Sequence, residues 1–453
     1  MDFQKHTLNN GLRVVTAPMS AMESATVQIL IGSGSRDENV KKQGLAHFLE
    51  HMVFKGTKKY PTSAVISAAV DGIGGEINAS TGKERTGYYI KAWERYLSLA
   101  FDILSQFISA PILKEREIEK EKGVIIEEIA MYEDLPMYKA PYLFEELLFD
   151  KTSLGWDVAG TPETIRTMEK KDFEGFIADY YQPENMVLSV AGKFDQSEVL
   201  KLAQKYFGKL GRSKLDVRNG KLDNEMGSGK SHLARQSEAN PVSHFSPRIS
   251  KLNPSKKPEI RMVNKKTEQA HIVLGVRGNR LGHPDRYKEA VLASILGGGM
   301  SSWLWNEIRE KRGLAYYVRC DIDHYKDTGY IAARAGVKLD SVEEAIEVIL
   351  AQFNKISTPG KVKDRELTKA KEYLKGRLAL GLEDTHSVSE FFGDQELFEE
   401  EVRTVEQVMA GIDAVTMSDV HSLANGFFTT PKLNLAVVGP FVDTVKFQKL
   451  LKL

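Results

Sequence analysis

The sequence predicts an α+β protein made of two similar α/β-layered domains from an internal duplication, each with helices packed on a mixed or antiparallel sheet. Three observations support this fold class. The chain has 453 residues, about three times the length of a typical domain. Runs of β-type residues alternate with helical apolar patterns in both halves, which favours layers over a bundle or a sandwich. Short matched segments also recur near the ends of the two halves.

The matched segments belong to two predicted domains, residues 1–210 and 259–453. The first opens with a β-type run at 26–31 and the second with one at 271–276, and helical patterns follow in each. Matches this short also arise by chance, but the shared order of elements favours a duplication. At a constant offset of 247 residues, identical residues meet as Asp172 and Asp419, Leu188 and Leu435, Val190 and Val437, Gly192 and Gly439, and Phe194 and Phe441.

Residues 211–258 interrupt this pattern and are predicted to form a flexible basic linker. The segment is rich in Gly, Ser, Asn and Pro, and it holds ten basic residues against four acidic ones. A contact with a partner or a nucleic acid through the basic excess is the alternative, but no aromatic interleaving supports it.

Composition excludes several classes of protein. Because 62 Lys and Arg residues balance 62 Asp and Glu residues, neither a nucleic acid nor a membrane is an expected partner. Hydrophobic residues make up 42% and charged residues 27% of the chain, which excludes wholesale disorder. No apolar run is long enough to span a membrane, and no signal core follows Met1. The single cysteine, Cys320, fits a reducing compartment, so we expect a cytoplasmic protein.

The strongest functional signal lies on a predicted helix at 44–54. His47 and His51 stand four residues apart, which places two imidazoles on one helix face at the spacing that a single zinc ion needs. Glu50 lies near the same face, where its carboxylate could take a proton from a water activated by the metal. The alternative is an exposed polar face that happens to hold these residues. A glutamate placed for base work within an otherwise apolar helix favours the metal.

A second predicted helix, at 116–133, offers a third ligand. A catalytic zinc site has three protein ligands and keeps one position for water. Glu121 and Glu128 are seven residues apart and share one helix face, whereas Glu127 lies about 100° round the helix and is the less favoured ligand. An acidic helix face is usually only solvated, so this helix alone does not predict a metal ligand. It does so only together with the two histidines.

Together these motifs resemble the inverted zinc-peptidase signature of the pitrilysin, insulin-degrading and mitochondrial processing peptidase family. The length of the chain resembles the two-domain, processing-peptidase-like branch of that family, and the linker is longer and more basic than the family usually carries. The resemblance covers nearly the whole chain except the linker. It rests on His47-x-x-Glu50-His51, on Glu121 and on Glu128 after 76 intervening residues, and it extends to Asn78-Ala79-Ser80-Thr81, 86–88, 296–302, Arg309 and Tyr316.

The resemblance implies a zinc metalloendopeptidase of the inverzincin type that holds one Zn²⁺ per chain. His47, His51 and Glu128 would hold the metal, and Glu50 would be the general base. Glu121 would be hydrogen-bonded behind a histidine and would orient its ring. The implied substrates are unfolded peptides or targeting segments, hydrolysed inside a closed chamber.

The resemblance also implies substrate contacts in two other places. Residues 78–81 would form an edge strand that binds an extended peptide through main-chain hydrogen bonds, although an ordinary edge strand explains these residues equally well. Arg309 and Tyr316 would bind substrate in trans within a homodimer, in which each chain completes the site of the other.

Two other classes of function compete with a peptidase. A catalytically silent scaffold or assembly subunit of the same family would be expected to lose ligands or the base, whereas this chain keeps them. A nucleotide-binding protein could use the glycines at 297–299. No Gly-Lys-Ser/Thr follows them, however, and a tight helix entry explains them better.

Overall fold

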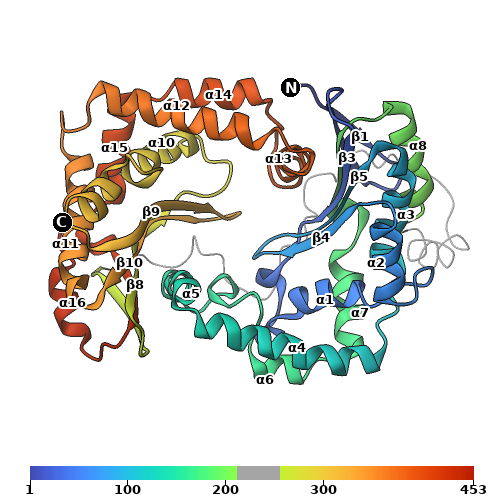
Figure 1. Ribbon diagram of the computed structural model, residues 1–453, viewed down its shortest axis with the longest axis horizontal. Coiled ribbons are helices and arrows are strands. Elements are labelled where there is room, and N and C mark those ends of the chain that lie inside the picture. The colour runs from blue at the N-terminus through green and yellow to red at the C-terminus, as the bar shows by residue number, and fades with distance from the viewer. Residues whose placement is uncertain (212–255) are drawn as a thin grey trace, which may run out of the picture.

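The computed structural model describes residues 1–211 and 256–453, which form two lobes (Figure 1). The first lobe holds a six-stranded sheet with the strand order β1-β2-β6-β3-β5-β4. Its elements are β1 (Gln4–Thr7), β2 (Arg13–Pro18), β3 (Ser24–Ile31), α1 (Leu45–Val53), α2 (Ser63–Asp71), β4 (Glu76–Thr81), β5 (Thr86–Trp93), α3 (Leu97–Ser109), α4 (Glu115–Asp134), α5 (Pro136–Leu148), α6 (Pro162–Arg166), α7 (Lys170–Tyr180), β6 (Met186–Gly192) and α8 (Gln196–Phe207).

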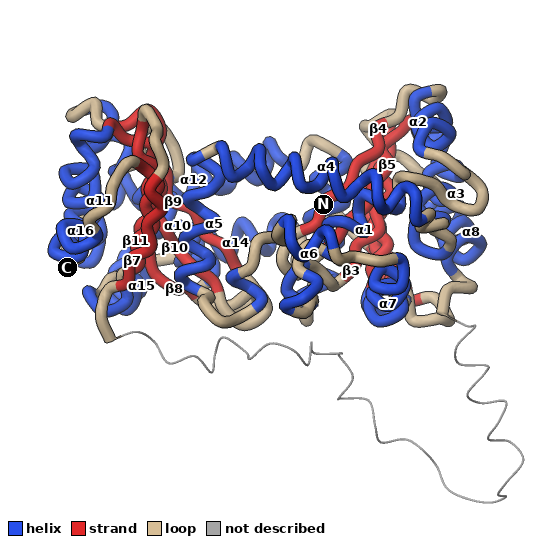
Figure 2. Tube along the Cα trace, turned by 90° about the horizontal axis from the view of Figure 1, so that it is seen from below, coloured by secondary structure: helices blue, strands red, loops and turns tan. Residues whose placement is uncertain are grey.

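The second lobe holds a five-stranded sheet with the order β7-β11-β8-β10-β9. In both lobes helices cover the outer side of the sheet, as Figure 2 shows for α3 and α8 and for α11 and α16. The elements are β7 (Glu259–Asn264), β8 (Gln269–Gly278), α10 (Arg286–Gly297), the π-helix η7 (Trp305–Glu310), β9 (Ala315–His324), β10 (Gly329–Lys338), α11 (Val342–Ser357), α12 (Asp364–Gly381), α13 (Thr385–Phe398), α14 (Val405–Asp413), α15 (Met417–Phe427), β11 (Asn434–Gly439) and α16 (Thr444–Leu450).

The two sheets repeat one topology. In the first sheet β6 runs parallel to β2 and antiparallel to β3, and in the second β11 runs parallel to β7 and antiparallel to β8. The order β2-β6-β3-β5-β4 therefore corresponds to β7-β11-β8-β10-β9. Leu188 and Leu435, which match in sequence, occupy equivalent places in β6 and β11. This correspondence confirms the predicted fold class.

The repeat extends to the capping of two helices. Asp172 and Asp419, another matched pair, accept backbone hydrogen bonds at the starts of α7 and α15. Such carboxylates stabilise a helix start because they satisfy free amides and lie at the positive end of the helix dipole. Each also pairs with a lysine from earlier in its own half, Lys42 at 2.6 Å and Lys288 at 3.0 Å.

Each half contributes one helix to the sheet of the other half, as Figure 1 shows for α5 and α13. Helix α5 packs on β8 and β11, where Phe144 is buried in one cluster with Val273. Helix α13 packs on β2, β3 and β6, where Phe392 is buried with Leu30. Burial of apolar side chains therefore holds the lobes together through two reciprocal contacts.

The predicted linker at 211–258 falls almost entirely outside the described residues, so its flexibility and the domain boundaries drawn from it stay predictions. The glycines at 297–299 lie where α10 ends. A Cβ on Gly297 would lie 2.1 Å from the backbone nitrogen of Cys320, so glycine allows the helix end to touch β9. In the part of the chain that the structure describes, no helix is both long and apolar enough to cross a membrane.

Candidate metal centre

Helix α1 begins at a position that the backbone and a buried carboxylate define. Gly44 caps the helix with a φ of 90°, a left-handed conformation that favours glycine. The buried Glu38 accepts hydrogen bonds from the amides of Gly44 and Ala46, both at 2.7 Å, at the end of the helix where amides lack intrahelical partners. The helix buries one face against the first core through Leu45, Ala46, Phe48, Leu49, Met52 and Val53.

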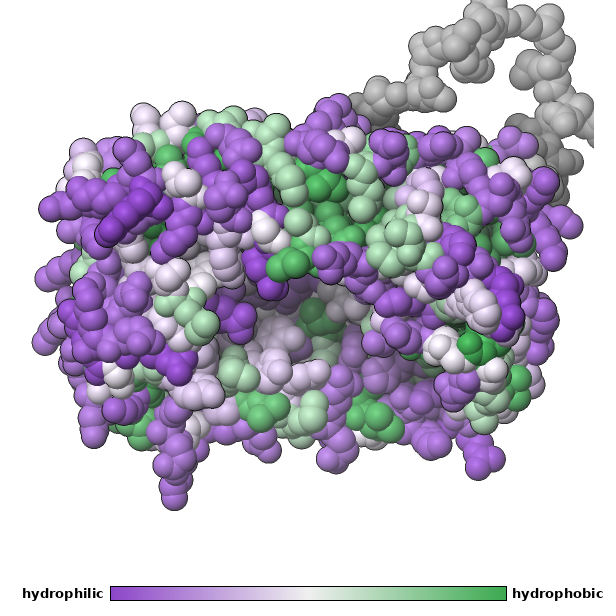
Figure 3. Space-filling model, turned by 45° about the horizontal axis from the view of Figure 1, so that its top comes forward, coloured by the Kyte–Doolittle hydropathy of each residue, from purple (hydrophilic) through white to green (hydrophobic). Residues whose placement is uncertain are grey.

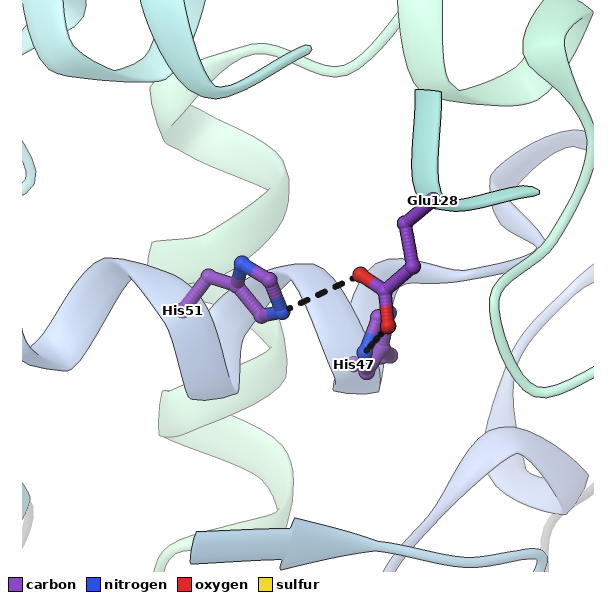
Figure 4. A group of neighbouring side chains, drawn as sticks. All are labelled: His47, His51 and Glu128. Carbon is purple, nitrogen blue, oxygen red and sulfur yellow. Dashed lines mark ion pairs between the residues drawn. The ribbon is translucent and has the colours of Figure 1, made fainter. Parts of the chain in front are cut away.

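His47 and His51 project from α1 towards Glu128 of α4 (Figure 4). Nε2 of His47 lies 3.8 Å from Oε1 of Glu128, and Nε2 of His51 lies 3.6 Å from Oε2. One ligand atom from each of the three residues lies within 4.8 Å of the others. Because zinc–ligand bonds of about 2.1 Å place tetrahedral ligand atoms roughly 3.4 Å apart, small side-chain shifts would suit the ion.

The chemistry of this donor set fits Zn²⁺. Two imidazole nitrogens and one carboxylate oxygen are typical zinc ligands and leave a fourth position for water. Burial, together with the nearby His51, lowers the pKa of His47 to about 4, so this ring is the neutral imidazole that a metal requires. Nδ1 of His47 is buried without a hydrogen-bond partner among residues 1–211 and 256–453.

Glu121 lies behind His51, on the same face of α4 as Glu128. One of its carboxylate oxygens is 3.0 Å from Nδ1 of His51, and the other is 2.6 Å from Nζ of Lys55. A proton held on Nδ1 by this contact leaves Nε2 free to face Glu128. Burial is the largest influence on the pKa of both partners and opposes their charged forms, but several contacts together outweigh it. His51 and Lys55 lower the pKa of Glu121, and Glu121 with the nearby Glu128 and Glu50 raises the pKa of His51. Glu127 is exposed and does not join the group.

Glu50 lies beside the three candidate ligands and contacts the edge of the first sheet. Oγ1 of Thr81 donates a hydrogen bond to Oε2 of Glu50 at 2.5 Å. Burial raises the pKa of Glu50, and the hydrogen bond from Thr81 and the nearby His51 only partly oppose this effect. The candidate base is therefore anchored to β4 as well as to α1.

Residues 78–81 lie in β4, the last strand in the order of the first sheet. They pair with β5 on one side only, from Asn78 opposite Tyr89 to Thr81 opposite Thr86. Asn78 and Ser80 are exposed, whereas Ala79 and Thr81 are half-buried. The other side of β4 is paired with no strand in the described parts of the chain, which leaves main-chain groups for an added strand next to α1.

Arg309 and Tyr316 lie in the other lobe, on η7 and β9, and the structure does not bring them to the metal group of the same chain (Figure 1). They do lie together, because the guanidinium of Arg309 is 5.4 Å from the ring centre of Tyr316 and 4.3 Å from that of Trp305. Tyr316 is 74% exposed. This pair is therefore available to a molecule outside its own lobe.

Three contacts of the site were not predicted from the sequence. Lys55 follows His51 by four residues, and both contact Glu121. Helical spacing could therefore have suggested that Lys55 lies beside His51. Glu38 at the start of α1 and Thr81 at the base carry no local signal, because their partners lie on other elements. Only the folded chain brings them together.

Comparisons with known proteins point to one family for both halves. Residues 13–161 match the family model "Insulinase (Peptidase family M16)", and residues 167–374 match "Peptidase M16 inactive domain". A protein of Streptomyces coelicolor named as an uncharacterized zinc protease is 33% identical, with 97% of this chain and 90% of that protein covered. One of Bacillus subtilis with the same description is 33% identical, with 96% and 98% covered. The crystal structure of a Helicobacter pylori protease aligns with a TM-score of 0.84 at 25% identity, covering 97% and 99% of the two chains.

Proposed function

The chain belongs to peptidase family M16, the insulinase family, and from this premise we propose that it is a zinc-dependent endopeptidase of the inverzincin type. Its substrates would be unfolded peptides or targeting segments, cleaved inside a closed chamber. The observation that carries the proposal is the meeting of His47, His51 and Glu128 beside a half-buried Glu50. Residues that are far apart in the sequence thus provide three ligands and a base at one place.

The roles of the protein groups follow from their contacts. A zinc ion in this site would supply Lewis acidity towards water and the scissile carbonyl. Glu50 would accept the proton of the attacking water and pass it to the leaving nitrogen. The carboxyl would hold the proton between the two steps. Thr81 would keep the carboxylate oriented during both steps.

Two further groups would keep one ligand in place. Glu121 would hold the ring of His51 through Nδ1, and Lys55 would hold the carboxylate of Glu121 in turn. Partners of this kind fix the orientation of a metal-binding histidine and raise its basicity. His47 lacks an equivalent partner in the described chain, so Glu121 acts on one histidine only.

The edge strand supports the choice of substrate. An extended peptide added to β4 would pair through its main chain. It would pass close to Glu50, because Thr81 belongs to β4 and its hydroxyl contacts the Glu50 carboxylate. Main-chain pairing requires an unfolded segment and depends little on side chains. This geometry suits unfolded peptides better than folded proteins.

We propose the closed chamber as a property of a homodimer. Figure 3 shows a hollow near the middle of a single chain, open to one side. A second copy could close this hollow and place its own Arg309 and Tyr316 opposite the metal centre of the first. The exposure of Tyr316 and the distance of the pair from its own metal centre support this arrangement.

A silent scaffold subunit is the competing function. Residues 167–374, which run from the end of the first half into the second, match a model described as inactive. The only group of three or more metal-ligating side chains in the described residues lies in the first half. That first half retains three candidate ligands and the base. An assembly role would give no reason to retain them, so we favour the peptidase.

Elemental analysis combined with a cleavage assay tests the proposal. The purified chain should contain about one zinc per chain and should cleave an unstructured peptide. A chelator should abolish cleavage, and added zinc should restore it. A zinc-loaded chain without activity on any unstructured peptide would support the scaffold instead, and a chain that takes up no zinc would contradict the metal site.

A further inference from the structure

A cavity lies on the flank of α4 that faces away from Glu128. It has a volume of about 690 Å³ and is bounded by α4, α5, the start of α6 and the loop at 155–163. The α4 residues in its wall lie about 100–240° round the helix from Glu128. The volume falls in the range of about 300–1,000 Å³ that small-molecule sites occupy. Apolar and aromatic side chains form much of the wall, namely Ile126, Ile129, Ala130, Tyr142, Trp156 and Pro162.

Carboxylates outnumber cations around this cavity, and two of them, the half-buried Asp157 and the exposed Glu163, make no ion pair within the described residues. Asp157 accepts a hydrogen bond from the Ala159 amide at 2.9 Å but makes no ion pair within the described residues. Burial raises the pKa of Asp157, although Lys83 and Lys139 partly oppose the effect. Three other carboxylates of the wall are already neutralised by basic residues, Glu133 by Lys139, Asp134 by Lys265 and Glu146 by Arg261.

We propose that this cavity binds a small organic cation with an apolar body, whose positive group pairs with Asp157 and lies against Trp156 and Tyr142. A half-buried carboxylate that makes no ion pair favours a charged hydrogen-bond donor, and the faces of aromatic rings attract cations. An anion would meet the surrounding carboxylates, and a neutral ligand would leave the charge of Asp157 offset only by the nearby Lys83 and Lys139. The apolar side chains of α4 would contact the body of the ligand.

The walls of the cavity touch both helices of the metal centre. On one side α4 carries Glu128. On the other side, the loop lies against Gln43, just before α1. A Cβ on Gly160 would lie only 2.2 Å from the carbonyl oxygen of Gln43, and Thr164 of α6 donates a hydrogen bond to that oxygen at 2.7 Å. Gly44, the next residue, caps α1. A ligand that fills the cavity would therefore support both helices and raise the affinity for zinc.

This coupling to zinc rests on the proposed function, whereas the cation site does not. Calorimetry with phenethylammonium and with neutral 2-phenylethanol tests the site on the full chain. The native chain should bind the ammonium on the order of tenfold more tightly than the alcohol. Asp157→Asn keeps the acceptor for the Ala159 amide and should lose this difference. Asp71→Asn, an exposed change on α2, should keep it.

A second variant and a zinc titration complete the test. Ala130→Trp should fill the cavity and prevent binding of both probes. Equal affinity of the native chain for ammonium and alcohol, or undiminished ammonium binding by Asp157→Asn or Ala130→Trp, would overturn the site. Zinc titration of the native chain should show a higher affinity in the presence of phenethylammonium, by reciprocal linkage. An unchanged zinc affinity would overturn the coupling alone, and a chain that binds the ammonium but no zinc would refute only the proposed function.

Discussion

The hydroxyl of Thr81 donates a hydrogen bond to the carboxylate of Glu50 and so joins the edge strand β4 to the helix α1. We expect this bond to orient the base. Thr81→Val should lower kcat by roughly tenfold, on the scale of one hydrogen bond to a charged group, and should leave zinc content unchanged. Thr81→Ser keeps the hydroxyl and should stay close to the native rate. Equal rates for both variants would show that the hydroxyl does not act on Glu50.

Glu50→Gln separates the base from the ligands. Glutamine has nearly the same shape but cannot accept the proton, so the chain should fold and bind zinc while kcat falls by about 10²–10⁴-fold, the usual contribution of a general base. Zinc content and circular dichroism provide the controls. Normal turnover by a zinc-loaded Glu50→Gln chain would mean that another group takes the proton.

Glu128 and Glu127 are neighbours in sequence, but only Glu128 joins the histidines. Glu128→Gln should weaken zinc binding by more than about 100-fold, which is beyond the loss typical of a residue behind a ligand. Glu127→Gln, on the exposed side of α4, is the matched control and should bind zinc nearly as the native chain does. Competition with a chromogenic chelator measures both affinities. The reverse ranking would place the third ligand at Glu127.

The part of this centre that could be predicted from the sequence is the part set by the spacing of residues within one helix. His47, Glu50 and His51 lie within one helix, where a period of 3.6 residues decides which side chains share a face. The same helical period favoured Glu128 over Glu127 as the third ligand, because Glu128 shares a helix face with Glu121. The order of elements in the two halves predicted the fold class for the same reason, because each strand or helix carries its own pattern.

Contacts between distant elements could not be predicted in this way. The buried face of α13 mixes Val388 and Phe392 with polar and small residues, and this pattern does not show which sheet the helix covers. Phe392 lies on the sheet of the other half. Likewise, nothing near Thr81 in the sequence shows that its hydroxyl would meet Glu50. Such contacts depend on tertiary packing, for which a single sequence carries no local signal.

The reciprocal helices lead to a prediction about stability. Phe392 on α13 is fully buried against the first sheet, so Phe392→Ala should lower the free energy of unfolding by about 3–5 kcal/mol. Hydrogen exchange should accelerate in β2, β3 and β6 of the first half, although the substitution lies in the second. Leu380→Ala on α12, where the side chain is 62% exposed, is the control and should change neither quantity. Faster exchange confined to the second lobe would show that the halves unfold independently.

The last prediction concerns where Arg309 acts. In one chain Arg309 and Tyr316 lie together on the lobe opposite the metal centre. If two chains enclose one chamber, the pair of each chain would bind substrate carbonyls or the developing oxyanion at the metal centre of the other. Separate Glu50→Gln and Arg309→Ala chains should then both be nearly inactive, since each lesion would damage every site of its own homodimer.

Mixing the two variants after subunit exchange distinguishes trans from cis action. In a mixed dimer that acts in trans, one site combines an intact Glu50 with an intact Arg309 and the other site has lost both. Random exchange makes about half of the dimers mixed, so about a quarter of all sites should regain activity. If the pair acts in cis, every site carries one lesion and the mixture stays as inactive as its parents. Tagged chains recovered together by affinity capture verify the exchange, and silence despite that exchange would rule out the trans arrangement.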